Sequence, residues 1–398
     1  MSLLAPAPVQ AASYDAVLEP LLADFDATAA ARDQSGGTAK RERDLIRSSG
    51  LLALAIPVEL GGLGGTLSDV LSITRRIAAV DSSLAHLFAF HHFQLATLRF
   101  YAPERQWAPL LRATAEHRWF WGNALNPLDK STAITPGPVA GEYRINGTKT
   151  YCSGASDSDR LVVSALRPGQ PGLVVATLPT DAPGVRVLDD WDNIGQRQTD
   201  SGRVAFTDVV VREEDLLQEP GPLGSPFASL RSGLGQIILV HIYLGLAEGA
   251  LAAAAKRLDP NGAPWLASQA ERVGADPFIL RNFGDYWVQA AGAGALADVA
   301  RARFQAAFDR GDDITEAERG QAAIAIATAK VAASRAALEI GSRIFEVLGA
   351  RATAADQRLD RFWRNARTHT LHDPVDYKLQ ELGDWRLNGR LPTPSFYS

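Results

Sequence analysis

The chain has 398 residues, a length that fits two or three domains. Its 46% hydrophobic and 21% charged residues are ordinary for a globular protein, so we expect buried cores without disulfide or metal support. The net charge of −5 argues against nucleic acid as a partner, and the single cysteine, Cys152, excludes an intrachain disulfide.

The first third of the chain reads as helical. Residues 1–6 contain no basic residue and no unbroken apolar run, so we expect no signal peptide and a cytoplasmic location. Apolar residues between 17 and 25 recur at helical spacing, as they do between 70 and 78, and a further helix is predicted over 83–100. Residues 1–120 are therefore assigned to an N-terminal α-helical domain.

The pattern changes near Trp121, where turn signals begin to alternate with short β-rich runs. The dipeptide Asn146-Gly147 predicts a hairpin turn between two such runs. Because the connections are too short for helical crossovers, we expect a middle antiparallel β domain over 121–225. Further strands are predicted over 160–165, 172–177 and 203–206.

From about Pro226 the pattern is helical again. The most apolar stretch, 237–255, contains ionisable and small residues, so it predicts a buried helix and not a membrane span. Thr315 and Glu318 have the spacing of a capping box that starts a long helix. Long Ala-rich helices need neighbours on several sides, so 226–398 is predicted to form a four-helix bundle, completed by other subunits. The predicted fold class is α+β.

Common nucleotide and hydrolase motifs are missing from the sequence, including Walker A, HExxH and GxSxG. Residues 292–297 match the loose string GxGxxA. No strand precedes them, so they indicate close helix packing and not a dinucleotide loop.

Histidines cluster in two places, the first of them within residues 85–92. His86 shares a helix face with Phe90, whereas His91 and His92 point elsewhere. Three metal ligands cannot converge from this spacing, so no metal site is expected. His91 and His92 are interpreted as helix-packing or surface histidines.

The second cluster contains His369 and His372, three residues apart and so on one face of a helix. Pro374 restricts Asp373, so the helix should end there. The helix dipole at a C-terminus favours protonated histidine. The pair predicts proton donors facing a pocket, with simple helix capping as the alternative.

Three segments together resemble the acyl-CoA dehydrogenases over nearly the whole chain. Residues 56–64 look like the P-E-x-G-G-x-G loop of that family, and residues 145–155 look like its N-G-x-K-x-x-x-S-x-A segment beside the flavin. Residues 281–284 resemble its R-x-x-F-G start of the C-terminal bundle. The resemblance implies the same α, β, α architecture, a flavin between the β domain and the last bundle, and a homotetramer.

Departures from the dehydrogenase pattern point to one branch of that superfamily. Residues 123–129 replace the usual flavin loop T-E-P-x-x-G-S-D, and residues 371–374 replace the context of the catalytic glutamate. The string T-H-T-L-H-D-P is similar to the branch that contains dibenzothiophene monooxygenase. That resemblance implies reduced FMN from a separate flavin reductase, O2 as co-substrate, and a C4a-hydroperoxyflavin that oxygenates a small organosulfur or aromatic heterocyclic compound. Residues 348–351 lack the double glycine expected near adenine, which favours FMN over FAD.

The resemblance also implies roles for individual residues. Ser153 is expected to bind the flavin edge, and Asn123 is expected to hold the peroxide region. His369 and His372 are expected to stabilise the distal oxygen or supply its proton, and His86 to position substrate or water. The expected cofactor-binding residues are Asn123, Asn126, Tyr151, Ser153, Trp191 and Arg281, with Arg281 on the FMN phosphate and Trp191 either at the flavin or in ordinary core packing.

Other interpretations remain open from the sequence alone. An FAD-dependent acyl-CoA dehydrogenase would need a base, for which Asp373 is the candidate. An N- or C-hydroxylase of the same fold is separated poorly from an S-oxygenase, since Phe90 stands where the dibenzothiophene enzymes are expected to carry tyrosine. A non-catalytic helical scaffold would bind no flavin.

Overall fold

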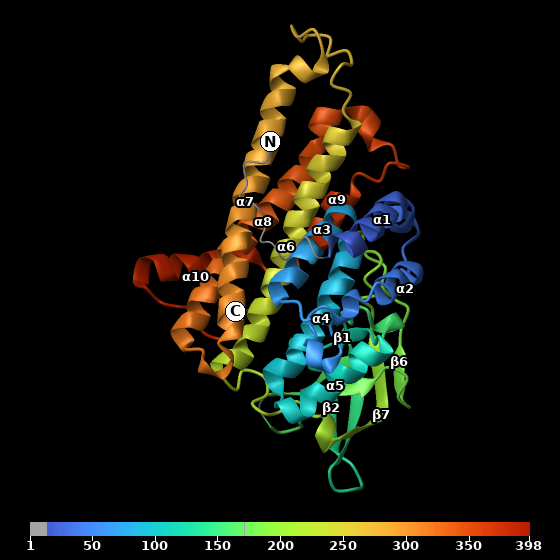
Figure 1. The fold of residues 1–398 in the computed structure, drawn as a ribbon, viewed down its shortest axis with the longest axis vertical. Coiled ribbons are helices and arrows are strands. Elements are labelled where there is room, and N and C mark those ends of the chain that lie inside the picture. Colours follow the sequence, from blue (N-terminus) through green and yellow to red (C-terminus); the bar gives the residue numbers. More distant parts are fainter. Residues whose placement is uncertain (1–13, 171) are drawn as a thin grey trace.

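The computed structural model describes residues 14–170 and 172–398. The stretch at 1–6, where no signal peptide is expected, lies outside the described residues. Helices, then strands, then helices follow one another along the chain, as predicted (Figure 1). The first helices are α1 (Asp15–Ser35), α2 (Lys40–Ser48), α3 (Leu67–Val80), α4 (Ser82–Tyr101) and α5 (Glu104–His117).

Local capping explains where the two central helices of this part begin. Thr66 and Asp69 form a reciprocal capping box at the start of α3. The side chain of Asp81 accepts a hydrogen bond from the Leu84 amide at the start of α4. Nearly every residue of α4 is buried, because the helix packs against α3, against a long C-terminal helix and against the first strand. The predicted helix over 83–100 is confirmed.

The middle part forms one sheet with strand order β1-β4-β2-β3-β7-β6, and β5 pairs with β4. The β2–β3, β3–β7, β4–β5 and β6–β7 pairs are antiparallel, but β1 and β2 each pair with β4 in parallel. The sheet is therefore mixed and not purely antiparallel. The β2–β3 hairpin lies between β1 and β4 in the sequence, so β4 can return parallel to β1 without a helical crossover. The strands are β1 (Trp121–Ala124), β2 (Ala133–Pro136), β3 (Glu142–Lys149), β4 (Arg160–Leu166), β5 (Leu173–Pro179), β6 (Val185–Val187) and β7 (Val204–Arg212).

The predicted hairpin turn at Asn146-Gly147 is wrong. Both residues lie inside β3, where the register against β7 shifts between Ile145 and Gly147. Gly147 has a φ of 127°, and a Cβ there would lie 2.1 Å from the Ser131 carbonyl oxygen. The glycine therefore serves a bulge and a close backbone approach, which is the other common use of glycine in a strand.

The C-terminal part is built on three long helices, α6 (Pro226–Arg257), α7 (Pro277–Asp309) and α8 (Glu316–Leu348), which pack together along the long axis in Figure 1. The shorter α9 (Arg361–His369) and α10 (Val375–Asn388) both pack against α8. The capping box of Thr315 and Glu318 is confirmed. Residues 292–297 lie within α7, as the helix-packing interpretation predicts.

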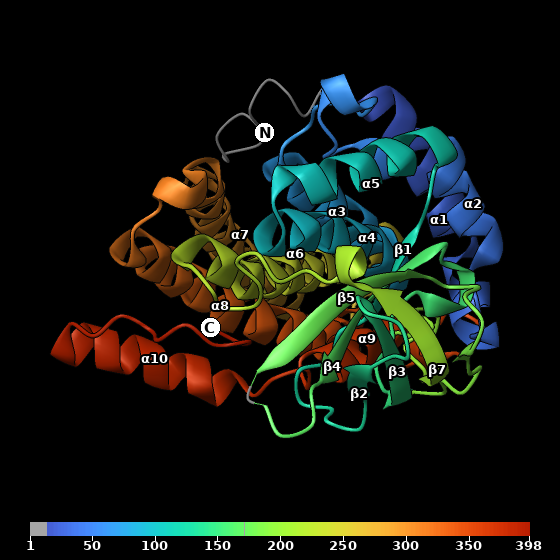
Figure 2. The ribbon, with the colours of Figure 1, turned by 90° about the horizontal axis from the view of Figure 1, so that it is seen from below.

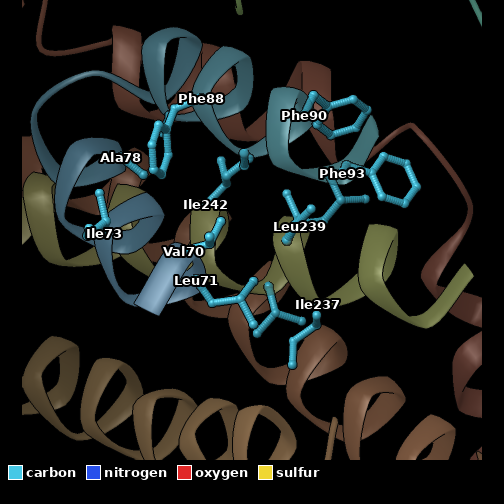
Figure 3. Packing of buried hydrophobic residues seen from close by; sticks show 14 of the residues in the cluster. Val70, Leu71, Ile73, Ala78, Phe88, Phe90, Phe93, Ile237, Leu239 and Ile242 are labelled. Atoms are coloured by element: carbon cyan, nitrogen blue, oxygen red, sulfur yellow. The ribbon is translucent and has the colours of Figure 1, made fainter. Parts of the chain in front are cut away.

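Helix α6 is the only described helix long and apolar enough to pass as a membrane span, but 78% of its most apolar window is buried inside the protein. Figure 3 shows its residues Ile237, Leu239 and Ile242 beside side chains of α3 and α4. The N-terminal helices and the long C-terminal helices thus share one core, whereas the sheet has a second core of its own. In Figure 2 the strands gather at one side of the helices.

Candidate active site

A cavity of about 620 Å³ opens where α4, the end of β1, the segment 191–201 and the end of α9 meet. This volume is typical of a small-molecule or cofactor site. Apolar and aromatic side chains form much of its wall, and a few polar groups converge on it. Of the predicted site residues, it is lined by His86, Asn123, Asn126, Tyr151, Ser153, Trp191, His369 and His372.

A chain of three side chains crosses one wall of the cavity. His86 Nδ1 lies 3.1 Å from His369 Nε2, and His369 Nδ1 lies 3.5 Å from the amide nitrogen of Gln196. An amide nitrogen can only donate, so this arrangement makes His369 Nδ1 an acceptor and His369 Nε2–H the donor to His86. The proton of His86 then resides on Nε2, which is buried without a protein partner. A hydrogen-bond donor without a protein partner thus lies on a residue that lines the cavity.

Burial holds both of these histidines neutral. It lowers the pKa of His86 to about 3, and it lowers the pKa of His369 well below the usual value, with the neighbouring His86 and His372 acting in the same direction. The expectation that the helix dipole favours protonated His369 is therefore wrong. Loss of hydration outweighs the dipole when an imidazole is this deeply buried.

His372 lies in a different setting from His369. Helix α9 ends at His369, so the expectation that the two share a helix face is wrong. His372 is in the following turn, with 43% of its side chain exposed, and its Nδ1 lies 2.9 Å from an Asp373 carboxylate oxygen. A carboxylate accepts, so Nδ1 carries the proton and Nε2 is left to face a ligand. Both histidines nevertheless reach the same cavity.

Asp373 is occupied as a charge partner. Its Oδ1 accepts hydrogen bonds from Lys330 Nζ at 2.5 Å and from Gln236 at 3.5 Å. Burial alone would raise the pKa of Asp373, but the hydrogen bond from His372 and the charge of Lys330 outweigh it and hold the pKa well below its usual value. A carboxylate held this firmly ionised is a poor base for abstracting a proton from a carbon acid.

Three hydroxyl groups beside the cavity form a chain. Ser153 Oγ lies 2.8 Å from Ser201 Oγ, which lies 2.8 Å from Thr199 Oγ1. The side-chain oxygen of Asn123 accepts from Gln94 and from a backbone amide, so its NH2 group is left to donate. These groups therefore offer hydrogen bonds to a polar ring edge.

Tyr151 and Trp191 flank the entrance. Tyr151 is 61% exposed, has a positive φ of 58°, and meets the Trp191 ring edge-on at 6.2 Å. The indole N–H of Trp191 donates to the Gln196 carbonyl at 2.8 Å. Asn126 donates to Thr150 at 3.2 Å. Trp191 thus lines the cavity and does not belong to a closed core.

Arg281 is not among the residues that line this cavity. It lies exposed near the start of α7, where its side chain contacts Asn282. The cation that lines the cavity is Arg367, one of whose buried nitrogens, Nε, has no partner. Sequence patterns did not indicate Arg367, nor Gln196, Thr199 and Ser201, since none of them belongs to a recognisable motif.

His91 and His92 are packing residues, as one of the two interpretations predicts. His91 Nε2 lies 2.8 Å from the Leu52 carbonyl, and its Nδ1 accepts from the Trp121 amide at 3.2 Å. His92 Nε2 lies 3.0 Å from the Leu51 carbonyl. Phe90, by contrast, stacks on His86 with ring centroids 3.9 Å apart and lines the cavity.

Comparison with known protein families matches three models in chain order. These are the N-terminal domain of acyl-CoA dehydrogenase at residues 12–118, its middle domain at 128–209 and its C-terminal domain at 237–377. The chain belongs to the acyl-CoA dehydrogenase family.

Within this family, similar proteins are monooxygenases. The chain is 47% identical to a probable FMNH2-dependent monooxygenase, SfnC, of Pseudomonas putida, covering 96% of this chain and 97% of the relative. It is 40% identical to dibenzothiophene monooxygenase of Mycolicibacterium goodii, covering 96% and 95%. The structure of methanesulfinate monooxygenase MsuC from Pseudomonas fluorescens is 48% identical and superposes with a TM-score of 0.94, covering 99% of this chain and 100% of that one. FMN-bound TdsC from Paenibacillus sp. A11-2 is 43% identical, with a TM-score of 0.91 and coverage of 96% and 99%.

This chain is accordingly an FMN-dependent monooxygenase, and its cofactor and co-substrate are FMN and O2. The residues of the cavity fit FMN. Aromatic groups at the entrance suit a flat ring system, and the hydroxyl chain of Ser153 suits a polar ring edge. The unpartnered Nε of Arg367 suits an anionic group. The acyl-CoA dehydrogenase alternative is not supported, and the occupied Asp373 agrees with that outcome.

Proposed function

We propose that the protein transfers one oxygen atom from O2 to the sulfur of a small organosulfur compound. The relatives named for dibenzothiophene and methanesulfinate support a sulfur substrate. The structural observation that carries the proposal is the unpartnered Nε2–H of His86, fixed by its link to His369. When bound, reduced FMN supplies the electrons that activate O2.

In this proposal His86 acts as a fixed hydrogen-bond donor beside the cavity, and His369 holds it in position through its own N–H. Both rings are neutral because they are buried, so the N–H of His86 stabilises a developing negative charge and is not released as a proton. His372 is partly exposed, and its Nδ1 is linked to Asp373, so its Nε2 is left to contact a ligand in the cavity. Phe90 stacks on His86 and keeps water from that side of the ring.

The residues around the hydroxyl chain are proposed to hold the cofactor. Ser153 and the NH2 group of Asn123 would bind polar atoms of the flavin edge, while Tyr151 and Trp191 would flank the ring. Asn126 would lie beside them. These assignments rest on the shared cavity and on the hydrogen-bond capacity that each side chain has left.

We further propose a homotetramer, a separate flavin reductase as partner, and a soluble cytoplasmic location. Apolar side chains on the outer face of α7 support assembly, since an exposed apolar row of this kind marks an interface. Arg281 lies on the same helix, so it can bind an FMN phosphate only at the cavity of a neighbouring subunit. The exposed row comprises Phe278, Leu280, Trp287, Val288 and Val299.

The test supplies reduced FMN from an unrelated flavin reductase under ¹⁸O2 and follows small sulfides and sulfinates by mass spectrometry. One ¹⁸O atom per turnover is expected in the product. His86→Ala is expected to lower the product yield about 100-fold, the lower end of the range for loss of a group that assists proton or charge transfer. The proposal fails if no sulfur compound acquires ¹⁸O while FMN still binds.

A further inference from the structure

Arg231 lies in the first third of α6, within the protein interior. Only 6% of the residue is exposed. Its Nε donates to Thr97 Oγ1 at 2.7 Å, and its guanidinium carbon lies 4.2 Å from the centre of the Phe93 ring. Its Nη2 is buried and has no hydrogen-bond partner. The guanidinium therefore has one face covered by Phe93 and an Nη2 donor without a partner, while Tyr101 is a further hydrogen-bonding neighbour of the group.

The charge of Arg231 is also uncompensated. Among the described residues, no carboxylate lies within 4.0 Å of it. Burial lowers the pKa of Arg231, with Tyr101 opposing, but arginine stays protonated in proteins. Burying an unpaired charge is costly, so a protein keeps one where a ligand of opposite charge completes it.

A pocket of about 70 Å³ lies against Arg231. Gly235, one turn further along α6, helps to keep it open, because a Cβ there would lie 3.2 Å from the Phe93 ring. Its size admits a few non-hydrogen atoms and not a tricyclic ring. It shares a wall with the large cavity, composed of Phe90, Asn123, Leu125, Pro127, His372 and Tyr397.

We propose that Arg231 anchors the oxyanion head of a small aliphatic sulfinate in this pocket. A sulfinate carries its negative charge and an oxidisable sulfur lone pair in one group. Its oxygens would bind the guanidinium, its alkyl group would pack against Phe93 and Leu239, and its sulfur would face the cavity. A neutral heterocycle would leave Arg231 unpaired. This assignment rests on the proposed S-oxygenation.

The reaction balances with the co-substrates already assigned. One O–O bond breaks and one S–O bond forms: RSO2⁻ + O2 + FMNH2 gives RSO3⁻ + H2O + FMN. The sulfur loses two electrons, reduced FMN supplies two more, and the second oxygen atom leaves as water. A carboxylate of the same size offers no such lone pair, so we expect acetate to bind as a competitive inhibitor.

Binding is tested first on the unaltered protein with oxidised FMN, where no turnover occurs. Calorimetry compares methanesulfinate with dimethyl sulfone, a neutral compound of similar size. Methanesulfinate is expected to bind at least 30-fold more tightly. Equal or absent binding of the two overturns the anion site.

The variant Arg231→Met keeps an unbranched apolar side chain and removes the guanidinium with its charge. It is expected to raise KM for methanesulfinate at least 100-fold, with FMN affinity within threefold of the parent. Arg99→Met is the matched control, because Arg99 also lies over aromatic rings, those of Trp107 and Phe308, but outside both pockets. Unchanged methanesulfinate kinetics in Arg231→Met would reject the proposal.

The outcomes separate this inference from the proposed function. If the protein oxygenates a neutral sulfide but does not bind methanesulfinate, the Arg231 site is wrong and S-oxygenation stands. If methanesulfinate binds through Arg231 yet no sulfur compound acquires ¹⁸O, the anion site stands and S-oxygenation fails.

Discussion

Two buried cations on the long C-terminal helices differ in one respect. Lys330 on α8 is paired with protein groups, since its ammonium donates to both the Asp373 carboxylate and the Gln236 amide oxygen at 2.5 Å. Arg231 on α6 has no carboxylate partner among the described residues, and its Nη2 has no hydrogen-bond partner. A buried charge that is paired with protein groups stabilises the fold, whereas a buried charge with an unpartnered donor indicates a ligand.

Helix α4 repeats this contrast with histidines. Both ring nitrogens of His91 bind the backbone, one at Leu52 and the other at Trp121. Earlier on the same helix, the Nε2 of His86 has no protein partner, and the residue lines the cavity. Neighbouring positions on one helix thus differ in role because of what surrounds them and not because of their chemistry.

The largest expected effect on stability comes from removing the carboxylate that pairs with Lys330. Asp373→Asn leaves Lys330 buried without a counter-charge, so we expect the free energy of unfolding to fall by about 3–5 kcal/mol. Urea unfolding followed by circular dichroism measures it. The double variant Lys330→Met with Asp373→Leu is expected to recover most of the loss. If Asp373→Asn is as stable as the parent, this pair is not a structural charge pair.

A second test compares the two histidines of α4. His91→Ala leaves a buried carbonyl and a buried amide unpaired, so a loss of about 2–4 kcal/mol in unfolding free energy is expected. His86→Ala is expected to cost about 1 kcal/mol or less, since its partner faces a cavity that water can enter. Equal losses of unfolding free energy in the two variants would contradict the distinction between fully hydrogen-bonded His91 and partly unpartnered His86.

A third test uses pH. Burial lowers the pKa of His91 to about 4 and that of His86 to about 3, so the unfolded chain binds protons below about pH 6.5 that the folded chain refuses. Stability is therefore full above pH 6.5 and falls as the pH decreases. Each such histidine contributes about 1.4 kcal/mol per pH unit over that window. Unfolding free energies at several pH values should show a shallower slope in His91→Gln than in the parent protein.

The smallest expected effect concerns the hydroxyl chain. Ser201→Ala removes the partner of Ser153, so the affinity for FMN is expected to fall about 3–10-fold, the equivalent of one hydrogen bond. Fluorescence quenching of free FMN measures it. Ser158→Ala is the matched control, since Ser158 bonds Thr180 away from the cavity. A larger loss in the control would place the effect in the β domain as a whole.

The order of helical and β regions was predictable because periodicity changes sharply at the relevant points. Capping at Thr315 and the buried nature of α6 follow from local patterns, and both are confirmed. The division at residues 120 and 225 stays a prediction. The hairpin at Asn146 failed because the Asn-Gly rule is local, while a glycine's use in a bulge depends on a distant segment, here Ser131.

The site was predictable only where a motif marked it. His86 and His369 are 283 positions apart, and family resemblance brought them together before the geometry did. Gln196 and Arg231 carry no such signal, since their importance arises from what packing leaves unpaired. The neutral state of His369 was missed for the same reason, because burial cannot be read from a helix-terminal position.

The wall shared by the two pockets has a consequence for how substrate preference changes over evolution. Phe93, Arg231 and Gly235 line the small pocket alone, whereas Ser153 and His369 line the large cavity alone. Under the proposed roles, substitutions in the first set can alter the size and charge of an accepted molecule while leaving the residues proposed to serve FMN and O2 untouched. Such a division lets substrate preference change one residue at a time in a lineage without passing through an inactive enzyme.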